Sequence, residues 1–567
     1  VDVDNWMRTF AFQRICGNWD SYGFSRGKNM YAYKRDGAPW RLFSWDVDFT
    51  LGSGSSANDS LWGANDPTIN RMYDTPTFRR MLWQAYRDAA DGPLDPEKAD
   101  TRMDALNAVF RRNGINAQDP RPVKQYLATR RQKILADYTR ADTGNFAITS
   151  GGGADITTST AQVTLTGSAP LAVRTIAING IPYPVTWTGF TAWSISIPLT
   201  EAVNQFRLTA LDRTGKPVPG LEDTIQVTST GNRPQARNFV AINEIQYHAD
   251  LPGTSFVELY NRSTTTAFDL SGVRLDGAGY TFPPGALIQP NAYLVLVANR
   301  SRFAAAYGNT VPIFDEFPGN LDNGGERLSL VQPDPTGGVT EILIDEVRID
   351  NHLPWPENAD GFGPSLQLID AAQDNGRVGN WRTTQNNDPN RTTPGRANVT
   401  RATLDAFPKL WINEVLAENF GGPVDNQGEN EPFIEIFNAG STGVDLSLFH
   451  LADSYTDLMR WQFPGGTSIG PGQFLRVWAD GEPGETVSGH IHTNFRLTPA
   501  SGSVALVRPQ MGGTAVIDYM DYRNLLPDRS LGLYPNGNPT GRRVFQFVSP
   551  GDANNPAVPD VRVTLNE

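Results

Sequence analysis

The sequence Gly17-Asn18-Trp19-Asp20, followed by Trp45-Asp46-Val47-Asp48, decides the fold at the front of this 567-residue chain. Apolar residues recur at three- and four-residue spacings over residues 6–15, which predicts a helix with one buried face that ends at Gly17. Two short aromatic and apolar runs, residues 30–33 and 40–43, flank a turn-forming segment and predict a β-hairpin. Because a hairpin returns to where it began, we expect Asp46 and Asp48 to lie near Asp20.

Aspartates grouped in this way suit phosphoryl transfer. In such sites one aspartate orients or deprotonates the attacking hydroxyl, and a second holds Mg²⁺ against the phosphates. Asp20 would take the first role, and Asp46 or Asp48 the second. An Asp-x-Asp before a Gly/Ser loop is equally typical of a strand end that enters a turn, so both interpretations remain open for the motif alone. The Gly/Ser run at residues 53–56 is interpreted as a plain loop.

The composition indicates several folded domains. The chain is longer than one hydrophobic core supports, and its 39% apolar residues are ample for folded cores. The single cysteine, Cys16, excludes an internal disulfide framework and a Cys-based zinc site, and we expect it to be a buried helix side chain. No apolar run is long enough to predict a transmembrane segment. The first residues do not resemble a signal peptide, so the chain is interpreted as a fragment or a processed product.

The net charge of −13 is unevenly distributed. Residues 1–140 carry 21 Lys and Arg against 17 Asp and Glu, or +4, whereas the remainder carries 27 against 44, or −17. An acidic chain of this kind disfavours a long nucleic-acid footprint, which needs many phosphate contacts. The mildly basic front leaves room for a small anionic ligand.

Helical periodicity continues beyond the acid-rich stretch. Three segments, residues 78–86, 103–110 and 123–135, carry apolar faces and are expected to form a packing base under the acids. Paired arginines on these segments are interpreted as solvated faces; the pairs are Arg79-Arg80, Arg111-Arg112 and Arg130-Arg131.

The front of the chain resembles the C-terminal part of the spore-coat CotH-type kinases, an atypical and often secreted branch of the protein-kinase-like fold. The resemblance covers about residues 1–140. The motifs that carry it are Asp4-Asn5-Trp6, Gly17-Asn18-Trp19-Asp20, Lys28-Asn29-Met30-Tyr31, Trp45-Asp46-Val47-Asp48 and the last helix with Tyr126, Arg130-Arg131 and Leu135.

The resemblance implies an ATP- and Mg²⁺-dependent site in residues 1–142. It places Asp20 on the catalytic aspartate, the pair Asp46 and Asp48 on the metal-binding position, and Lys28 and Asn29 on phosphate or metal contacts. A kinase-like site also needs a glycine-rich cover and a lysine–glutamate pair on an N-terminal lobe. Only 19 residues precede Asp20, so we expect the chain to carry half a nucleotide site and to depend on a preceding lobe for activity.

The remaining sequence predicts three all-β domains. Alternating runs and an Asn179-Gly180 hairpin signal over residues 154–231 predict an immunoglobulin-like sandwich, interpreted as a spacer or docking module. After it, Ile242-Asn243-Glu244-Ile245 returns as Ile412-Asn413-Glu414-Val415 and Phe256-Val257-Glu258-Leu259-Tyr260-Asn261 as Phe433-Ile434-Glu435-Ile436-Phe437-Asn438. Matches in the same order predict two copies of one domain, assigned with their extensions to residues 238–400 and 408–560. Both copies resemble the lamin-tail domain, an immunoglobulin-like sandwich that bacteria append to large secreted and surface proteins.

The repeated glutamates raise the possibility of Ca²⁺ binding. Glu244 with Glu258, and Glu414 with Glu435, are placed to pair across strands, and a long acidic insertion follows Glu414 in the second copy. Acids at strand ends also commonly accept turn N–H groups, and this alternative remains open. The two histidines of His490-Ile491-His492 are interpreted as exposed polar residues. The Ca²⁺ candidates are Glu414, Asp425, Glu429, Glu431 and Glu435.

The fold class predicted is multidomain: an α+β kinase-like C-lobe fragment followed by three all-β immunoglobulin-like sandwiches. Two functions are consistent with it. The first is part of a secreted or cell-surface CotH-like protein kinase, inactive as the chain stands. The second is an extracellular structural or adhesive protein that uses its sandwiches for protein contacts and surface assembly, with a degenerate kinase-like front. Neither predicts nucleic-acid binding or a transmembrane segment.

Overall fold

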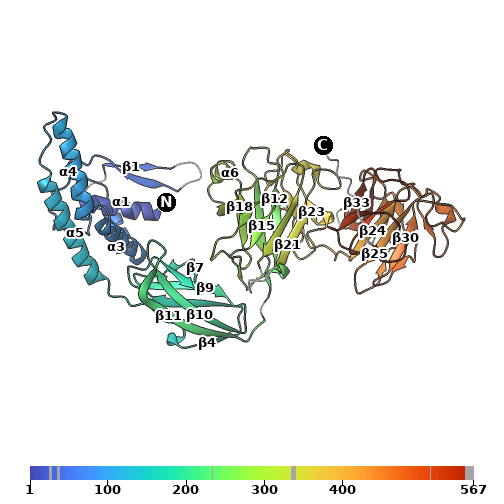
Figure 1. Cartoon of the computed structure of the whole chain (residues 1–567), viewed down its shortest axis with the longest axis horizontal. Coiled ribbons are helices and arrows are strands. Elements are labelled where there is room, and N and C mark those ends of the chain that lie inside the picture. The colour runs from blue at the N-terminus through green and yellow to red at the C-terminus, as the bar shows by residue number, and fades with distance from the viewer. Residues whose placement is uncertain (25–27, 35–38, 233, 334–339, 511–512, 556–567) are drawn as a thin grey trace.

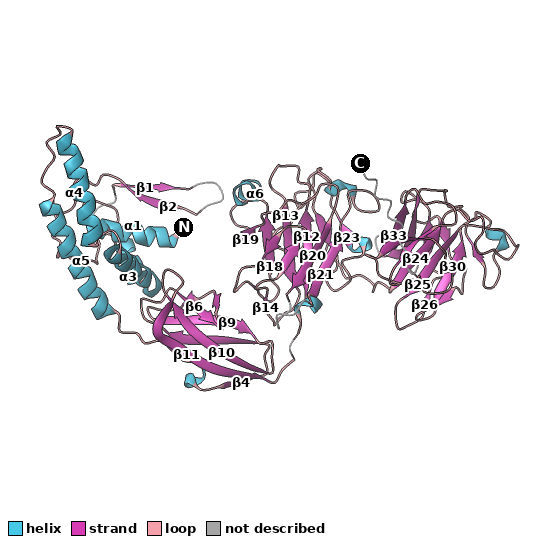
Figure 2. Cartoon of the chain, viewed as in Figure 1, coloured by secondary structure: helices cyan, strands magenta, loops and turns pink. Residues whose placement is uncertain are grey.

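Four units follow one another along an elongated chain in the computed structural model, with helices gathered at one end and strands over the rest (Figures 1 and 2). The structure describes residues 1–24, 28–34, 39–232, 234–333, 340–510 and 513–555. This arrangement confirms the predicted fold class of a helical α+β front followed by β-sandwiches. The turn of the predicted hairpin at residues 35–38 lies outside the described residues.

The front unit is a helical core with one small hairpin. Apolar faces of α1, α3 and α5 meet in its core, which contains Met7, Phe10, Leu82, Tyr86 and Ile134. Aspartate caps and prolines at the first helical turn begin α2 and α4, as the sequence chemistry favours. The elements are α1 (Val3–Cys16), β1 (Met30–Tyr33), β2 (Arg41–Ser44), α2 (Pro67–Asp74), α3 (Pro76–Asp91), α4 (Pro96–Arg112) and α5 (Arg121–Ala141).

Helix α4 departs from the predicted packing base. It lies along α5 and projects with it away from α1 and α3 (Figure 1), and none of its side chains is buried. Leu106, Val109 and Phe110 are 51%, 48% and 45% exposed, so the prediction that this face packs under the acids is wrong. The periodicity correctly predicts the helix, but periodicity alone does not say what covers its apolar face.

Two of the six paired arginines are buried rather than solvated. Arg130 donates to the carbonyl oxygens of Arg14 and Asp59, which ties α5 to the end of α1 and to the loop before α2. Arg80 donates to the carbonyls of Phe190 and Pro170 in the next domain, and its guanidinium lies 3.6 Å from the Trp187 ring centroid. A guanidinium can satisfy several loop carbonyls at once, which explains why these positions are buried.

The second unit is the predicted immunoglobulin-like sandwich. Its two sheets enclose Trp193, and the hairpin expected at Asn179-Gly180 joins β6 to β7 with φ of 51° and 85° at the two turn residues. One sheet has the order β4 (Ile156–Thr158), β11 (Pro217–Ser229), β10 (Val203–Leu211), β6 (Thr175–Ile178), β7 (Ile181–Tyr183). The other has the order β3 (Ala147–Ile148), β5 (Gln162–Ser168), β9 (Ala192–Pro198), β8 (Thr186–Trp187).

The third and fourth units share one topology, which confirms the repeat. In the third, a large sheet is ordered β19 (Ile313–Glu316), β18 (Tyr293–Val297), β13 (Phe256–Asn261), β12 (Val240–Gln246), β22 (Leu366–Leu368), β23 (Trp381–Arg382). It packs on a sheet ordered β16 (Tyr280–Thr281), β15 (Arg274–Asp276), β20 (Arg327–Gln332), β21 (Ile342–Arg348), and β14 (Phe268–Asp269) pairs with β17 (Leu287–Ile288). Helix α6 (Arg300–Tyr307) follows β18.

The fourth unit repeats this order strand for strand. Its large sheet is β31 (Ile491–His492), β30 (Phe474–Trp478), β25 (Phe433–Asn438), β24 (Leu410–Leu416), β34 (Ser530–Leu533), β35 (Arg542–Phe545). The facing sheet is β28 (Trp461–Gln462), β27 (His450–Ala452), β32 (Gly502–Gln510), β33 (Gly513–Tyr522), and β26 (Val444–Asp445) pairs with β29 (Ser468–Ile469). Because β22 and β34 lie inside the large sheets, the extension of each copy is an integral part of its domain.

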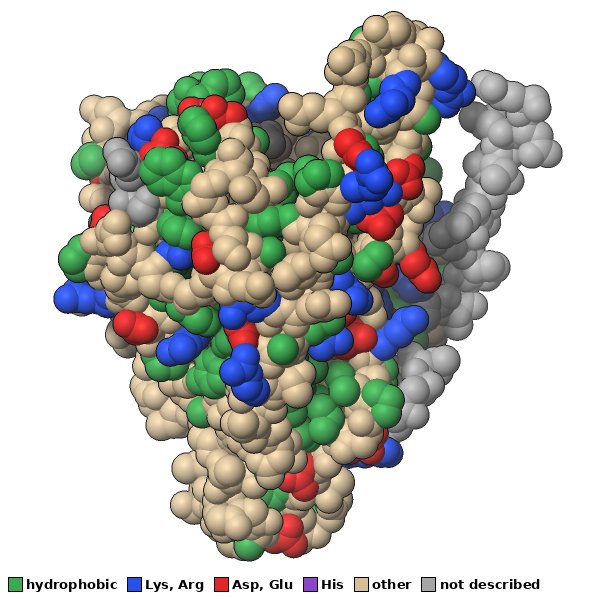
Figure 3. Space-filling model, turned by 90° about the vertical axis from the view of Figure 1, so that its left-hand side faces the viewer, with side chains coloured by type: hydrophobic (Ala, Val, Ile, Leu, Met, Phe, Trp, Pro, Cys, Tyr) green, Lys and Arg blue, Asp and Glu red, His purple; other side chains and the backbone are tan. Residues whose placement is uncertain are grey.

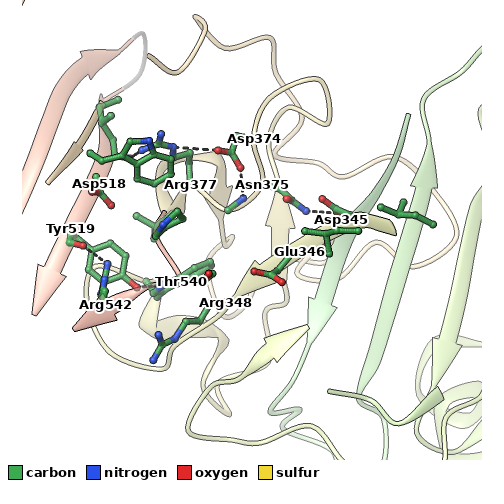
Figure 4. Close-up of a pocket in the computed structure, with 18 of the residues that line it drawn as sticks. Asp345, Glu346, Arg348, Asp374, Asn375, Arg377, Asp518, Tyr519, Thr540 and Arg542 are labelled. Carbon is green, nitrogen blue, oxygen red and sulfur yellow. Dashed lines mark hydrogen bonds and ion pairs between the residues drawn. The ribbon is translucent and has the colours of Figure 1, made fainter. Parts of the chain in front are cut away.

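The two repeated domains are joined by buried contacts. Four residues of the second copy, Ala452, Ala505, Val507 and Val516, pack into the core of the first. Arg377, 3% exposed, donates from the first copy to the carbonyls of Leu410 and Ile517 in the second. A cavity of about 420 Å³ lies at this junction, with Arg377, Asp518 and Tyr519 among its lining residues (Figure 4).

Candidate functional site

The hairpin brings the three aspartates together, as predicted. Strands β1 and β2 pair with Met30 opposite Ser44, so Asn29 and Trp45 are neighbours, and the Trp45 N–H donates to the Asn29 carbonyl at 3.2 Å. The Asn29 side chain in turn donates to the Asp20 carbonyl at 2.9 Å. Asn18, which is buried, donates to the Asp46 carbonyl at 3.3 Å and so links the two ends of the stretch directly.

Asp20 is the most enclosed of the three acids. Its side chain is 11% exposed, and Oδ2 lies 2.6 Å from Lys28 Nζ and 3.4 Å from Asn29 Nδ2. The Lys28 side chain is 53% exposed, so the cation faces solvent while it holds the carboxylate. The structure therefore joins Asp20, Lys28 and Asn29, the predicted catalytic and cofactor-binding candidates, in one contact group.

Asp46 and Asp48 form an exposed carboxyl pair. A hydrogen bond with Asp48, followed by the repulsion between the two charges, raises the pKa of Asp46 above its ordinary value; Lys28 opposes the shift and Asp20 adds to it. Asp48 also accepts the Phe49 N–H at 2.9 Å. Two carboxylates held this close together form a site where bound positive charge would be favourable.

The loops that carry these acids hold unusual backbone conformations. Asn29, Asp46 and Leu51 have φ values of 58°, 52° and 56°, the left-handed region that non-glycine residues seldom adopt. The Leu51 N–H donates to the Cys16 carbonyl at 2.8 Å, which fastens the second loop to the end of α1. Clusters of such residues are found where the surrounding structure fixes a functional geometry.

Gly17 and the Gly/Ser loop pack against each other. Gly17 ends α1 with φ of 68°, and a Cβ there would lie 2.5 Å from the Tyr126 hydroxyl and 2.9 Å from Ser55 Cβ. A Cβ at Gly54 would lie 2.7 Å from Trp19 Nε1. The Gly/Ser run thus folds back on the front unit, in agreement with its interpretation as a plain loop.

Exposed aromatic side chains line the hairpin and the loop after it, and were not predicted as a feature of the site. Tyr31, Trp40, Trp45 and Phe49 are 57%, 46%, 59% and 48% exposed. The density of aromatic residues between positions 31 and 49 is the sequence signal that could have indicated this surface. Large exposed apolar patches usually mark a place where another structure binds.

Cys16 ends helix α1, as predicted, but it is half-buried rather than fully buried. Burial raises the pKa of its thiol to about 12, so the reactive thiolate is not populated near neutral pH.

In the repeated domains, the paired glutamates accept hydrogen bonds from the C-terminal extension of their own domain and so fasten it to the large sheet. Glu414 lies opposite Glu435 in the register of β24 and β25, as Glu244 lies opposite Glu258 in the first copy. Ser530 Oγ donates to Glu414 at 2.5 Å, and the Gly551 N–H donates to Glu435 at 2.5 Å. Burial raises the pKa of Glu435 to about 7.

A short motif that the sequence reasoning missed closes both copies. Thr393-Pro394-Gly395-Arg396-Ala397-Asn398 in the first copy corresponds to Ser549-Pro550-Gly551-Asp552-Ala553-Asn554 in the second. In both, the glycine N–H donates to the second glutamate of the pair, and the asparagine side chain donates to the carbonyl of the asparagine in β12 or β24. Its recurrence at the end of each copy is the signal that could have identified it.

The other Ca²⁺ candidates lie apart from that pair in the loop between β24 and β25. Asp425, Glu429 and Glu431 belong to overlapping groups of acids whose oxygen atoms lie within 4.8 Å of one another, and Glu414 and Glu435 belong to none of the groups found among the described residues. His492 joins Asp425 there. The prediction that both histidines are exposed is wrong for His492, which is fully buried with its two ring nitrogens in contact with Asp480 and Asn426. His490 is half-buried.

The geometry defines a helical unit with an acid-bearing hairpin, followed by immunoglobulin-like domains, two of them copies of one topology. Residues 1–139 match the family model described as CotH kinase protein, and residues 233–357 and 405–523 match the model of the Lamin Tail Domain. The chain therefore contains a CotH kinase-like domain and two lamin tail domains, as the sequence resemblance predicts.

Comparisons beyond the family models add little. No curated protein matches the chain. A solved structure, that of Yersinia pseudotuberculosis InvD, is 12% identical and covers 67% of this chain and 98% of its own, with a TM-score of 0.12. A TM-score this low carries no structural argument. Within the described part of the chain, no helix has the length and apolar character needed to cross a membrane.

Proposed function

We propose that residues 1–142 form the hydroxyl- and metal-handling half of a protein-kinase site that transfers a phosphoryl group from ATP to a protein hydroxyl. One observation carries the proposal: Lys28 and Asn29 hold the Asp20 carboxylate beside the exposed pair Asp46 and Asp48. A phosphoryl-transfer site requires both roles: one acid that orients the acceptor hydroxyl and others that hold the metal ion.

Asp20 is the group that receives the acceptor hydroxyl. Its carboxylate is fixed by a cation and an amide, so it can orient the hydroxyl and accept its proton with little reorganisation. Lys28, half exposed, is placed to neutralise phosphate charge while it holds Asp20.

The Asp46 and Asp48 pair fits a divalent cation. The hydrogen bond between the two carboxyls raises the pKa of Asp46, which means that two full negative charges are unfavourable there without a counter-ion. Oxygen ligands from one or two carboxylates suit Mg²⁺, which supplies charge neutralisation for the phosphates when bound.

The exposed aromatic cluster supports a second, covering half. Tyr31, Trp45 and Phe49 are uncovered next to the acids, where a nucleotide-binding lobe would have to lie. We infer that such a lobe, from a preceding segment or another protein, completes the nucleotide site.

The test is phosphoryl transfer by the longest natural chain that contains these residues, with Mg-ATP and a protein acceptor. We expect labelling in the parent protein, loss of at least about 100-fold in Asp20→Asn, and a similar loss in the double variant Asp46→Asn/Asp48→Asn. Asp74→Asn, an exposed acid on α2, is the matched control and should label like the parent. Equal labelling by Asp20→Asn and the parent would remove Asp20 from the mechanism.

A structural role at the cell surface is the second candidate, and the rigid tandem of lamin tail domains favours it. Shared core residues and the Arg377 contacts make the two copies one extended body, which suits a spacer or adhesive arm. Cross-linking on intact cells should then find the chain outside the cell, in repeated contacts with surface proteins. Recovery only as an isolated intracellular monomer would contradict both this role and the extracellular location.

A further inference from the structure

The two lamin tail domains differ at one corner of their large sheets. In the first copy, Asn299 follows β18 and caps helix α6, and Phe303 of that helix packs into an apolar cluster with Phe256. In the second copy, Asp480 follows β30 at the corresponding place, and the residues after it form a polar loop with a short 3-10 turn, Pro483–Glu485. The same corner is therefore apolar in one copy and acidic in the other.

At the acidic corner, carboxylates outnumber the cationic side chains that pair with them among the described residues. The corner contains three overlapping groups of residues, and within each group the candidate ligand atoms lie within 4.8 Å of one another. The groups are Asp425, Asp480 and His492; Asp425, Glu429 and Glu485; and Glu429, Glu431 and Glu482. Arg496 pairs with Glu431, and His492 lies 2.6 Å from Asp480. Among the described residues, no lysine or arginine forms an ion pair with Asp425, Glu429 or Glu485.

Asp425 supplies an independent indication of a missing ligand. It is only 6% exposed, and its Oδ1 accepts the backbone N–H groups of Gln427 and Glu429. Its Oδ2 is buried and has no hydrogen-bond partner, although the carboxylate belongs to two of the groups. Leaving such an oxygen unpaired is costly unless a cation binds it.

His492 fixes the geometry of the corner but is not free to bind a metal. Nδ1 lies 2.6 Å from Asp480 Oδ2 and Nε2 lies 2.7 Å from Asn426 Oδ1. The Asn426 amide nitrogen donates to the Glu485 carbonyl, so its oxygen is the atom that faces the ring. Both ring nitrogens therefore already have a partner within the protein. The ring links the loop that carries Asp425 to the loop that carries Glu485.

We propose that this corner is a Ca²⁺ site formed by the carboxylates of Asp425, Glu429 and Glu485, with His492 as a positioning residue. The available ligands are oxygens from two loops, and Ca²⁺ accepts six to eight oxygens in flexible geometry. Mg²⁺ demands a stricter octahedron, and Zn²⁺ prefers nitrogen and sulfur ligands that the corner does not offer. The corresponding corner of the first copy is filled by α6, so we expect no ion to bind there.

Calcium titration of the whole chain by calorimetry, with hydrogen exchange as a local readout, tests the site. We expect Ca²⁺ to slow exchange in residues 417–432 and 480–492 and to leave residues 247–255 and 298–316 of the first copy unchanged. In Glu429→Gln/Glu485→Gln we expect the affinity to fall at least about tenfold and the protection to disappear. Both changed residues are at least partly exposed, so this variant should fold.

Control variants distinguish Ca²⁺ binding at this corner from non-specific binding to the negative charge of the chain. Glu201→Gln/Glu357→Gln removes two exposed acids elsewhere and should bind Ca²⁺ like the parent. His492→Gln should weaken binding about tenfold or more, because a positioning residue orients ligands that it does not replace. Absence of protection up to about 10 mM Ca²⁺, unchanged binding in the Glu429 and Glu485 variant, or a preference for Zn²⁺ would each overturn the proposal.

Discussion

Single residues in strained or crowded positions fix the geometry of the acid site. Asn29 and Asp46 hold positive φ values on the two sides of the hairpin, and each such residue costs about 1–3 kcal/mol. Local hydrogen bonds offset this cost. The Asn29 carbonyl accepts a hydrogen bond from the Trp45 N–H, and the Asp46 carbonyl accepts one from the Asn18 side chain. The placement of Asp46 near Asp20 therefore depends on a few hydrogen bonds rather than on a deep core.

Gly17→Ala should destabilise the front unit more than an ordinary glycine substitution. A Cβ at Gly17 meets a left-handed φ of 68° and also the Tyr126 hydroxyl at 2.5 Å, so both strain and a clash oppose it. We expect a loss of about 3 kcal/mol, measured as faster hydrogen exchange of α1 and α5.

Gly114→Ala is the matched control for this effect. Its φ of 73° is similar, but no atom lies within 4 Å of the added Cβ. The loss there should be limited to the conformational cost of about 1 kcal/mol. Equal losses at the two glycines would show that the contact with Tyr126 is unimportant.

At the scale of elements, periodicity and repetition in the sequence predicted which helices and strands form, but not which of them contact one another. The helix ending at Gly17, the hairpin and the two copies of one domain follow from local spacing, which the chain must satisfy wherever it packs. The exposed face of α4 and the burial of Arg80 and Arg130 depend on which element lies opposite, and spacing carries no such information. The sequence left open that the repeated glutamates accept N–H groups, but it could not identify the donors, because these lie more than 100 residues away.

Ser530→Ala should loosen the extension of the second lamin tail domain. Ser530 is fully buried and donates to Glu414, so its removal leaves a buried carboxyl with one donor fewer. We expect a loss of about 1–3 kcal/mol and faster exchange of β34, whereas Ser441→Ala, at an exposed position, should change neither. Unchanged exchange of β34 would mean that the Ser530 hydroxyl does not hold this strand.

Buried acids in the two lamin tail domains should lower the free energy of unfolding of these domains as pH rises. Burial raises the pKa of Glu244, Asp345 and Glu435 to about 7, from ordinary values of 4.5 for Glu and 3.8 for Asp. The folded state thus binds more protons than the unfolded state between about pH 4 and 7. Their stabilising contribution is complete below pH 4 and is lost as pH rises towards 7.

Thermal unfolding between pH 4 and 8 measures this dependence. We expect the transition of the lamin tail domains to fall in temperature as pH rises from about 4.5 to 7. Glu435→Gln keeps an oxygen that can accept the Gly551 N–H but cannot ionise, so its slope should be smaller. A slope in the variant as steep as in the parent would exclude Glu435 as a contributor.

At the scale of the whole molecule, buried arginines add directed hydrogen bonds to the contacts between neighbouring domains. Arg80 connects the front unit to the first sandwich through four backbone carbonyls. Gln84 donates to the carbonyl of Leu171 and shares that of Val173 with Arg80. Arg377 does the same between the lamin tail domains and lies 3.4 Å from the Trp411 ring centroid. Backbone carbonyls fix direction as well as distance, so these junctions set the angles between neighbouring domains.

Arg377→Met should release the second lamin tail domain from the first. Methionine retains apolar bulk but leaves the carbonyls of Leu410 and Ile517 buried without their donor, at a cost of about 2–4 kcal/mol. We expect a larger radius of gyration by X-ray scattering and separate unfolding transitions for the two copies by calorimetry. Arg382→Met, at an exposed position on β23, should behave like the parent protein. If both variants scatter like the parent, the shared apolar core between the copies, rather than the guanidinium, holds the tandem straight.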